Sequence, residues 1–88
     1  MQTAETESEG MIMKGTKLGK NIKFLRRLSG LNQTAFARAF ETSQSRISEY
    51  ETGKRLPPTE LLIRLADEYQ VSFDWLFTGE INPEKSFR

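Results

Sequence analysis

The segment of residues 43–58 constrains the fold more than any other part of the chain, because it can form only one short helix. Ser43 is a favourable N-cap residue, and Gly53 readily ends a helix in the left-handed conformation. The Leu-Pro-Pro sequence that follows cannot continue a helix, since proline lacks an amide hydrogen and restricts the residue before it. The segment therefore predicts a helix over about residues 44–51.

This short helix has one apolar edge and one polar edge. Ile47 and Tyr50 lie three positions apart, so both face the same side of the helix. The polar edge consists of flexible hydrogen-bonding side chains, namely Gln44, Ser45, Arg46 and Glu49. A helix of this kind can be packed through its back while its front stays open to a partner.

Comparable signals divide the flanking sequence into four more helices. Leu18, Ile22 and Leu25 recur at helical spacing and predict a helix over about 17–29, ended by Gly30. The other three are predicted over residues 33–40 with Asn32 as N-cap, over the apolar-periodic segment that Thr59 caps, and over residues 73–78 between Ser72 and Gly79. We therefore expect an all-α fold, a compact five-helix bundle with short connections.

Composition separates this bundle from both ends of the chain. Residues 1–16 are polar, acidic and without apolar periodicity, so we expect a disordered acidic leader. Residues 17–79 form the expected domain, and residues 80–88 are expected to be a flexible C-terminal tail.

The 88 residues contain no cysteine and no histidine, which excludes disulfides, thiolate metal sites and the commonest general base. Glu49 and Glu51 lie two positions apart on a helix and do not face each other. No phosphate-binding loop or metal-ligand motif is present, so we expect no enzymatic activity, cofactor or metal. No secretory signal or membrane-spanning run is present either, which indicates a cytoplasmic protein without a membrane partner.

The net charge of +1 conceals an uneven distribution along the sequence. Residues 17–58 contain nine cationic side chains and three acidic ones, whereas residues 1–16 and 59–88 are both net acidic. A basic middle between acidic ends suits a surface that faces a polyanion. An ordinary mixed surface would carry the same charges, so the partner has to be inferred from the motif.

The predicted helices over 33–40 and 44–51 are separated by about three residues, which is typical of a helix-turn-helix. In that motif the second helix enters the major groove of DNA. There glutamine can pair with adenine, serine with several bases, and glutamate with cytosine N4. The polar edge of the second predicted helix carries these side chains, so we expect residues 44–51 to be a recognition helix.

Three stretches resemble the phage lambda repressor/Cro-like (XRE-type) helix-turn-helix family. They are Leu31-Asn32-Gln33-Thr34-Ala35-Phe36-Ala37, then residues 43–57, then Leu65-Ala66 followed by residues 71–79. The resemblance covers about residues 17–79. It implies a lambda-repressor-like fold and a sequence-specific, double-stranded DNA-binding transcriptional regulator that acts as a repressor.

The resemblance also implies roles for matching positions. The base-reading side chains would be Gln44, Ser45, Arg46 and Glu49, with Arg46 able to reach a phosphate instead. The phosphate contacts would be Gln33, Lys54 and Arg55, and Gln33 begins a helix, whose N-terminus attracts anions. Arg26 and Glu51 match an ion pair that joins the first helix to the end of the third. Any of the DNA-facing side chains, taken alone, could be an ordinary exposed polar residue.

Glu41 departs from the family pattern, which commonly has glycine at that position of the turn. A left-handed conformation costs glutamate about 1 kcal/mol more than glycine. The turn is therefore either remodelled or strained.

A protein-interaction module, such as an antitoxin or an adaptor, is the alternative function. The helix over 73–78 is the most apolar segment of the chain and predicts a docking face for a protein partner or a dimer seam. Both functions are compatible, because one short recognition helix specifies few base pairs and a two-fold dimer doubles the site. We therefore expect a homodimer.

Overall fold

The computed structural model describes residues 17–79. The first helix covers residues 17–28 of this part, followed by α2 (Gln33–Ala39), α3 (Gln44–Thr52), α4 (Thr59–Tyr69) and α5 (Phe73–Thr78). These five helices account for all the regular structure of the described residues, which confirms the predicted all-α class. The predicted leader (1–16) and tail (80–88) lie outside the described residues.

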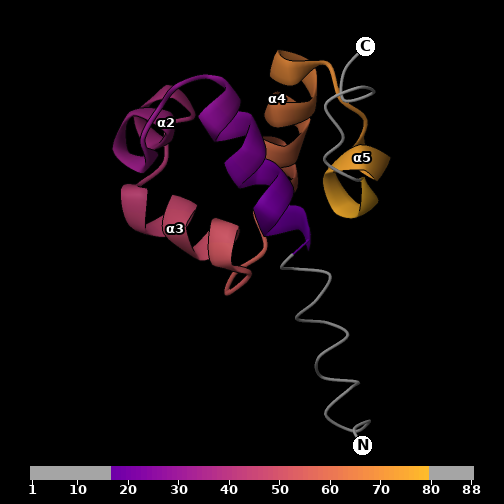
Figure 1. Ribbon diagram of the computed structural model, residues 1–88. Helices are drawn as coiled ribbons and strands as arrows, with labels where there is room; N and C mark the ends of the chain where they lie inside the picture. The colour runs from indigo at the N-terminus through magenta and orange to yellow at the C-terminus, as the bar shows by residue number, and fades with distance from the viewer. Residues whose placement is uncertain (1–16, 80–88) are drawn as a thin grey trace, which may run out of the picture.

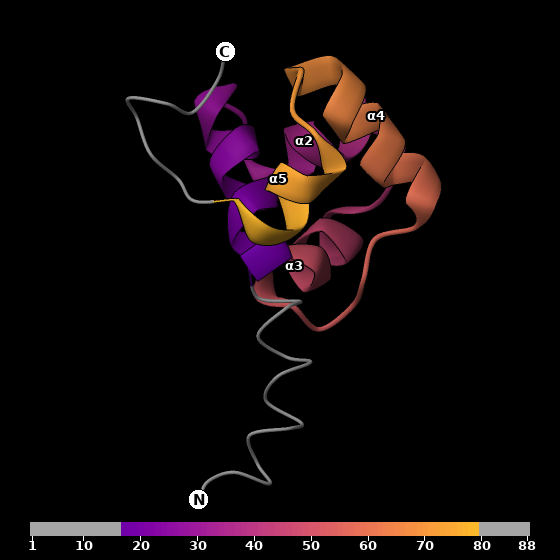
Figure 2. The same cartoon turned by 90° about the vertical axis from the view of Figure 1, so that its right-hand side faces the viewer.

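The first helix lies at the centre of the molecule and separates two helix pairs (Figure 1). The pair α2 and α3 lies on one side of it, and the pair α4 and α5 on the other. In the perpendicular view, α5 lies next to the first helix and α4 forms the outer edge (Figure 2). This arrangement leaves α3 at the surface on the side away from α5.

One hydrophobic core joins all five helices, and the residues that the apolar spacing placed on the inner faces of the first helix and of α3 are among its members. Its buried members are Leu18, Ile22, Leu25, Phe36, Ala37, Phe40, Ile47, Tyr50, Leu61, Leu62, Leu65 and Leu76. Each large side chain taken out of water in this way contributes about 1.5–3 kcal/mol. No helix within residues 17–79 is long and apolar enough to cross a membrane.

Side-chain caps start three of the helices, as predicted. The Asn32 side chain accepts a hydrogen bond from the amide of Ala35 at 2.8 Å. Ser43 accepts one from the amide of Arg46 at 3.1 Å, and Ser72 caps α5 in the same way. Each cap satisfies an amide that has no partner inside the helix.

The predicted start of α4 was wrong by one residue. Pro58 is the N-cap, and Thr59 is the first helical residue. Proline has no side-chain acceptor, but its φ of −67° and ψ of 155° suit the residue before a helix. Its carbonyl oxygen accepts from the amides of Leu61 and Leu62, so the first turn of α4 forms without a side-chain cap.

A buried asparagine ties the first helix to α5. The Asn21 side-chain amide donates to the carbonyl oxygens of Trp75, Leu76 and Gly79 at 2.9, 3.1 and 3.2 Å. These carbonyls lie at the end of α5, where a short helix leaves acceptors unsatisfied. Asn21 therefore acts as a cap supplied by a distant helix, and it holds α5 against the core.

Candidate nucleic-acid interface

The turn between α2 and α3 is tight and strained. Glu41 has a φ of 57°, so the strain foreseen for this position is present in the native backbone. The amide of Thr42 donates to the carbonyl of Ala37 at 2.9 Å, which closes the turn. Arg64 of α4 donates to the carbonyls of Ala39 and Phe40, and its guanidinium lies 5.1 Å from the centre of the Phe40 ring. The angle between α2 and α3 is thus held by α4.

A buried ion pair fixes α3 to the first helix. Arg26 Nε donates to Glu51 Oε2 at 2.6 Å, and the two side chains are only 10% and 3% exposed. Arg26 also donates to the carbonyl of Leu31 at 2.8 Å. The backbones of the first helix and α3 come close together at Gly19, because glycine has no Cβ. A Cβ at this position would lie only 2.5 Å from the carbonyl oxygen of Tyr50. The position of α3 therefore depends on the first helix.

A chain of hydrogen bonds leads from this ion pair to the start of α3. Gln33 Nε2 donates to Glu51 Oε1 at 3.0 Å, and Gln44 Nε2 donates to Gln33 Oε1 at 2.6 Å. A carboxylate can only accept, so the NH₂ group of Gln33 must face Glu51 and its oxygen must face Gln44. The orientation of both amides is therefore set by the buried Glu51.

The outer face of α3 carries most of the predicted base-reading side chains. Gln44 and Ser45 are exposed, and Glu49 is partly exposed. Ser48 and Thr52 share the outward side with Ser45 and Glu49, because they lie three or four positions from them. Sequence reasoning missed these two residues, although the same spacing would have found them.

Arg46 lies apart from the other predicted base readers. It is four positions before Tyr50, so it shares a flank of α3 with that residue. Both line a hollow between α3 and α4. Arg46 therefore lies on a different flank of α3 from Ser45.

Glu49 and Arg55 lie together at the end of α3. Gly53 caps the helix with a φ of 83°, and the amides of Lys54 and Arg55 both donate to the carbonyl of Glu49. The chain thus turns back, and Arg55 Nε donates to Glu49 Oε1 at 2.7 Å. This hydrogen bond and the charge of Glu49 raise the pKa of Arg55 above its ordinary value. Lys54 is exposed beside them.

The sequence of the chain matches the Helix-turn-helix family over residues 22–76. It is 38% identical over 62 residues to the uncharacterized HTH-type transcriptional regulator YazB of Bacillus subtilis, which covers 70% of this chain and 90% of that protein. It is 36% identical over 59 residues to the HTH-type transcriptional regulator ImmR of the same species, covering 67% of this chain and 46% of ImmR.

The chain is also 39% identical over 56 residues to antitoxin PezA of Streptococcus pneumoniae, covering 64% of this chain and 35% of PezA. It therefore spans about a third of PezA and less than half of ImmR. No solved structure matches it.

The family match covers more than half of the chain and includes the unit formed by α2, its strained turn and α3. YazB matches over nearly its whole length. The chain therefore belongs to the helix-turn-helix family, of the lambda-repressor-like (XRE) type.

Proposed function

We propose that the protein is a transcriptional regulator that binds double-stranded DNA sequence-specifically, with α3 in the major groove. DNA binding by such regulators is the activity of the family to which the chain belongs, and YazB and ImmR are named as transcriptional regulators. Within this activity, we assign the direct base contacts to Gln44, Ser45 and Glu49.

The observation that carries the assignment is the chain of hydrogen bonds from Glu51 through Gln33 to Gln44. One N–H of the Gln44 amide is used by Gln33, which leaves its oxygen and a second N–H for another partner. That donor and acceptor match N7 and the N6 amino group of adenine. Because the amide is oriented before DNA arrives, little side-chain entropy is lost on binding.

Glu49 can enter the groove because Arg55 accompanies it. An isolated carboxylate close to phosphates would be repelled. The ion pair with Arg55 offsets that repulsion and directs the free carboxylate oxygen of Glu49, which then accepts from cytosine N4. Arg55 would contribute to phosphate binding from the same position.

The backbone contacts in this proposal come from both ends of the helix-turn-helix. Gln33 is the first residue of α2, where free amides favour an anion. Lys54 and Arg55 follow α3, and Arg46 lies on its flank. Each cation that neutralises a phosphate releases counterions and makes binding sensitive to salt.

We further propose that the protein acts as a homodimeric repressor in the cytoplasm, without catalytic activity. A single α3 covers only a few base pairs, whereas two copies related by a two-fold axis would contact half-sites about one turn of DNA apart. A repressor needs only to occupy its operator, which requires no catalytic group.

Selection from a pool of random duplexes tests the proposal, because it returns a consensus together with its symmetry. We expect a palindromic consensus with half-sites about 10 base pairs apart. Gln44→Ala with Ser45→Ala should abolish the consensus and leave weak, salt-sensitive binding. Arg38→Ala changes an exposed residue on α2, away from α3, and is the control. Recovery of no consensus by the unchanged protein would refute sequence-specific binding.

The second candidate function is that of an antitoxin or adaptor, which the similarity to antitoxin PezA favours. Its predicted docking face is smaller in the structure than the sequence implied. Leu76 is buried, Trp75 and Phe77 pack against the core, and Phe73 is 40% exposed. Protein partnering through α5 would be independent of salt and would be removed by Phe73→Ser.

A further inference from the structure

The three side chains assigned to base contacts differ in how far their own chemistry fixes what they can read. The carboxylate of Glu49 can only accept hydrogen bonds, and the hydroxyl of Ser45 rotates to donate or to accept. Gln44 carries an oxygen and an NH₂ group on one flat amide, so a half-turn of its last torsion exchanges acceptor and donor. The specificity of Gln44 therefore depends on what holds its amide.

A buried carboxylate holds this amide through Gln33. Glu51 Oε2 accepts from Arg26 Nε at 2.6 Å, and Glu51 Oε1 accepts from Arg26 Nη2 at 3.1 Å and from Gln33 Nε2 at 3.0 Å. The Glu51 side chain is only 3% exposed, and Arg26 is itself held by the carbonyl of Leu31. Gln33 therefore keeps its NH₂ group on Glu51 and its oxygen on Gln44.

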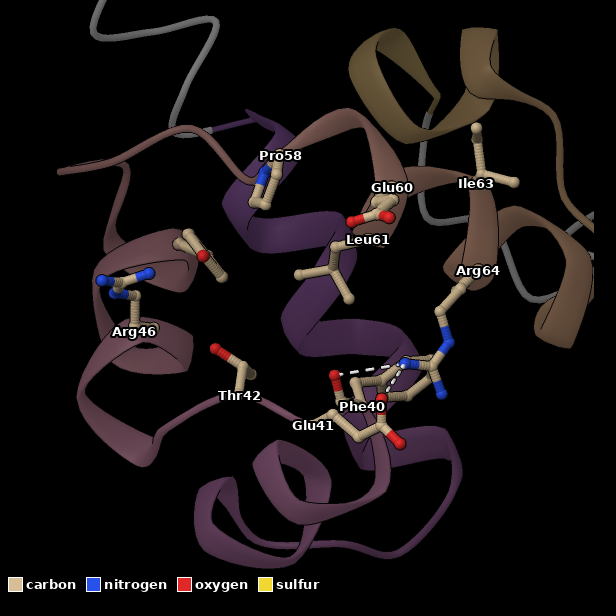
Figure 3. Close-up of a pocket in the computed structure, with 10 residues that line it drawn as sticks. Phe40, Glu41, Thr42, Arg46, Pro58, Glu60, Leu61, Ile63 and Arg64 are labelled. Atoms are coloured by element: carbon tan, nitrogen blue, oxygen red, sulfur yellow. Dashed lines mark hydrogen bonds and ion pairs between the residues drawn. The ribbon is translucent and has the colours of Figure 1, made fainter.

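This connection also needs α2 and α3 to keep their relative position, because Gln33 and Gln44 are the first residues of these two helices. Arg64 of α4 donates to the carbonyl of Phe40 and lies 3.6 Å from the carboxylate of Glu41, which fixes the turn between them (Figure 3). Gln44 Nε2 accordingly lies 2.6 Å from Gln33 Oε1. The Gln44 amide is thus held with its nitrogen towards α2.

An amide held in this way distinguishes adenine from guanine. Gln44 has its oxygen and one N–H left for a base, and adenine offers the N6 amino group and the N7 acceptor that match them. Guanine offers two acceptors, O6 and N7, so the oxygen of Gln44 would face O6 with no hydrogen between them. In a Gln44 amide turned the other way, the NH₂ group would take the position of that oxygen and donate to O6.

We propose that Glu51, a buried residue outside the base-contacting set, determines that Gln44 selects adenine over guanine. Glu51 is a positioning residue, because its carboxylate can only accept and Gln33 passes this constraint on to the Gln44 amide. The effect on DNA rests on the proposed function. The orientation of the two amides is a property of the free protein and is tested without DNA.

Nuclear Overhauser measurements on the ¹⁵N-labelled full chain test the orientation. The protons that Arg26 Nη2 and Gln33 Nε2 donate to Glu51 Oε1 each lie about 2 Å from that oxygen, so they are at most about 4 Å apart. We expect a contact between them, measured at low temperature where side-chain protons exchange slowly. Absence of this contact, with both resonances observed, would overturn the proposal, whatever the protein does on DNA.

Binding to variants of the selected consensus tests the effect on base preference. The position that Gln44 reads is the one whose preference Gln44→Ala removes, and we expect adenine there. Guanine at this position should weaken binding of the unchanged protein about 10-fold. Gln33→Leu keeps the buried ion pair but frees the Gln44 amide, and should reduce the preference to about 2-fold at this position alone. Glu51→Gln introduces a donor and should do the same.

The exchanged pair, Gln33→Glu with Glu51→Gln, separates positioning from a merely structural role. A carboxylate then faces Gln44 directly and can only accept, so the preference of about 10-fold should return. The affinity should fall equally for all sequences, because a negative charge is added beside a phosphate. Arg38→Ala, an exposed change on α2 away from α3, should keep the full preference.

The outcomes distinguish this proposal from the proposed function. A base other than adenine at the Gln44 position, an unaltered preference in Gln33→Leu, or no recovery in a folded exchanged pair would each overturn the role of Glu51 while DNA binding stands. Recovery of no consensus by the unchanged protein would refute the proposed function instead. Breaking a buried ion pair is costly. If the variants at residue 51 do not fold, Gln33→Leu and the Overhauser contact decide the outcome.

Discussion

Glu41 shows how a single residue can be unfavourable and still be retained. Its φ of 57° is a conformation that glycine adopts at no steric cost. The turn keeps this geometry because hydrogen bonds from Thr42 and Arg64 close it on both sides. The ion pair between Glu41 and Arg64 is exposed and contributes at most about 1 kcal/mol. Neighbouring hydrogen bonds therefore hold Glu41 in this strained conformation.

Glu41→Gly is expected to raise the free energy of unfolding by about 1 kcal/mol, because it relieves the left-handed strain. For a domain of this size the melting temperature should rise by about 4–8 °C. Thermal unfolding followed by circular dichroism measures it. Glu41→Ala is the control, since it removes the same ion pair but keeps the strain, and it should give no gain. A gain from both variants would place the cost in the carboxylate instead.

Gln33 and Gln44 should act on DNA as one unit. The Gln44 amide is oriented by Gln33, so either alanine substitution disrupts the same base contact. A double-mutant cycle on operator affinity is therefore expected to give a coupling energy of about 1 kcal/mol. The pair Gln33 and Glu49, which share no hydrogen bond within the described residues, should be additive within about 0.5 kcal/mol. Additivity of both pairs would refute the orienting role of Gln33.

At the scale of elements, short helices here depend on caps and on neighbours. The helices α2, α3 and α5 have 7, 9 and 6 residues, too few to be stable alone. Local caps stabilise their starts, whereas distant residues stabilise two of their ends. Arg64 reaches the end of α2, and Asn21 reaches the end of α5.

Asn21→Ala is expected to lower the free energy of unfolding by about 2 kcal/mol, because three carbonyls at the end of α5 lose their donor. Asn21→Asp should cost more, since a carboxylate cannot donate to them. Urea unfolding measures both variants. Lys20→Ala, an exposed change on the same helix, should stay within about 0.5 kcal/mol of the unchanged protein. An Asn21→Ala variant of normal stability would show that α5 is held by apolar packing alone.

For the whole molecule, the arrangement of helices concentrates two kinds of contact on one side. At the start of α3, Gln44 is hydrogen-bonded to Gln33 of α2. Near its end, Glu49 forms an ion pair with Arg55 of the following loop. Lys54 lies in the adjoining loop. In the proposed function, base recognition and backbone attraction are carried by different side chains, and each has its own experimental signature.

Lys54→Gln should weaken operator binding equally for all sequences and reduce the slope of log affinity against log salt by about 1. Gln44→Ala should have the opposite signature, with a lost preference for one base and an unchanged slope. Fluorescence anisotropy over a range of salt concentrations distinguishes them. A Lys54→Gln variant with the original slope would remove Lys54 from the phosphate contacts.

The sequence by itself determined the helices, most of their caps and the core. These features follow from short-range spacing, as at Leu18, Ile22 and Leu25, and from single residues such as Ser43 and Gly53. The start of α4 was misplaced because a proline can occupy the N-cap position without a side-chain acceptor. Such signals are local, so a linear sequence contains them.

Only the tertiary structure decided how the polar side chains pair. Nothing in the sequence shows that Gln33 lies between Glu51 and Gln44, or that Arg55 meets Glu49. A hydrogen bond depends on a distance of about 3 Å and on direction. Distances of that kind between residues far apart in the chain arise only when helices pack, and the packing places Arg46 on a different flank from Ser45.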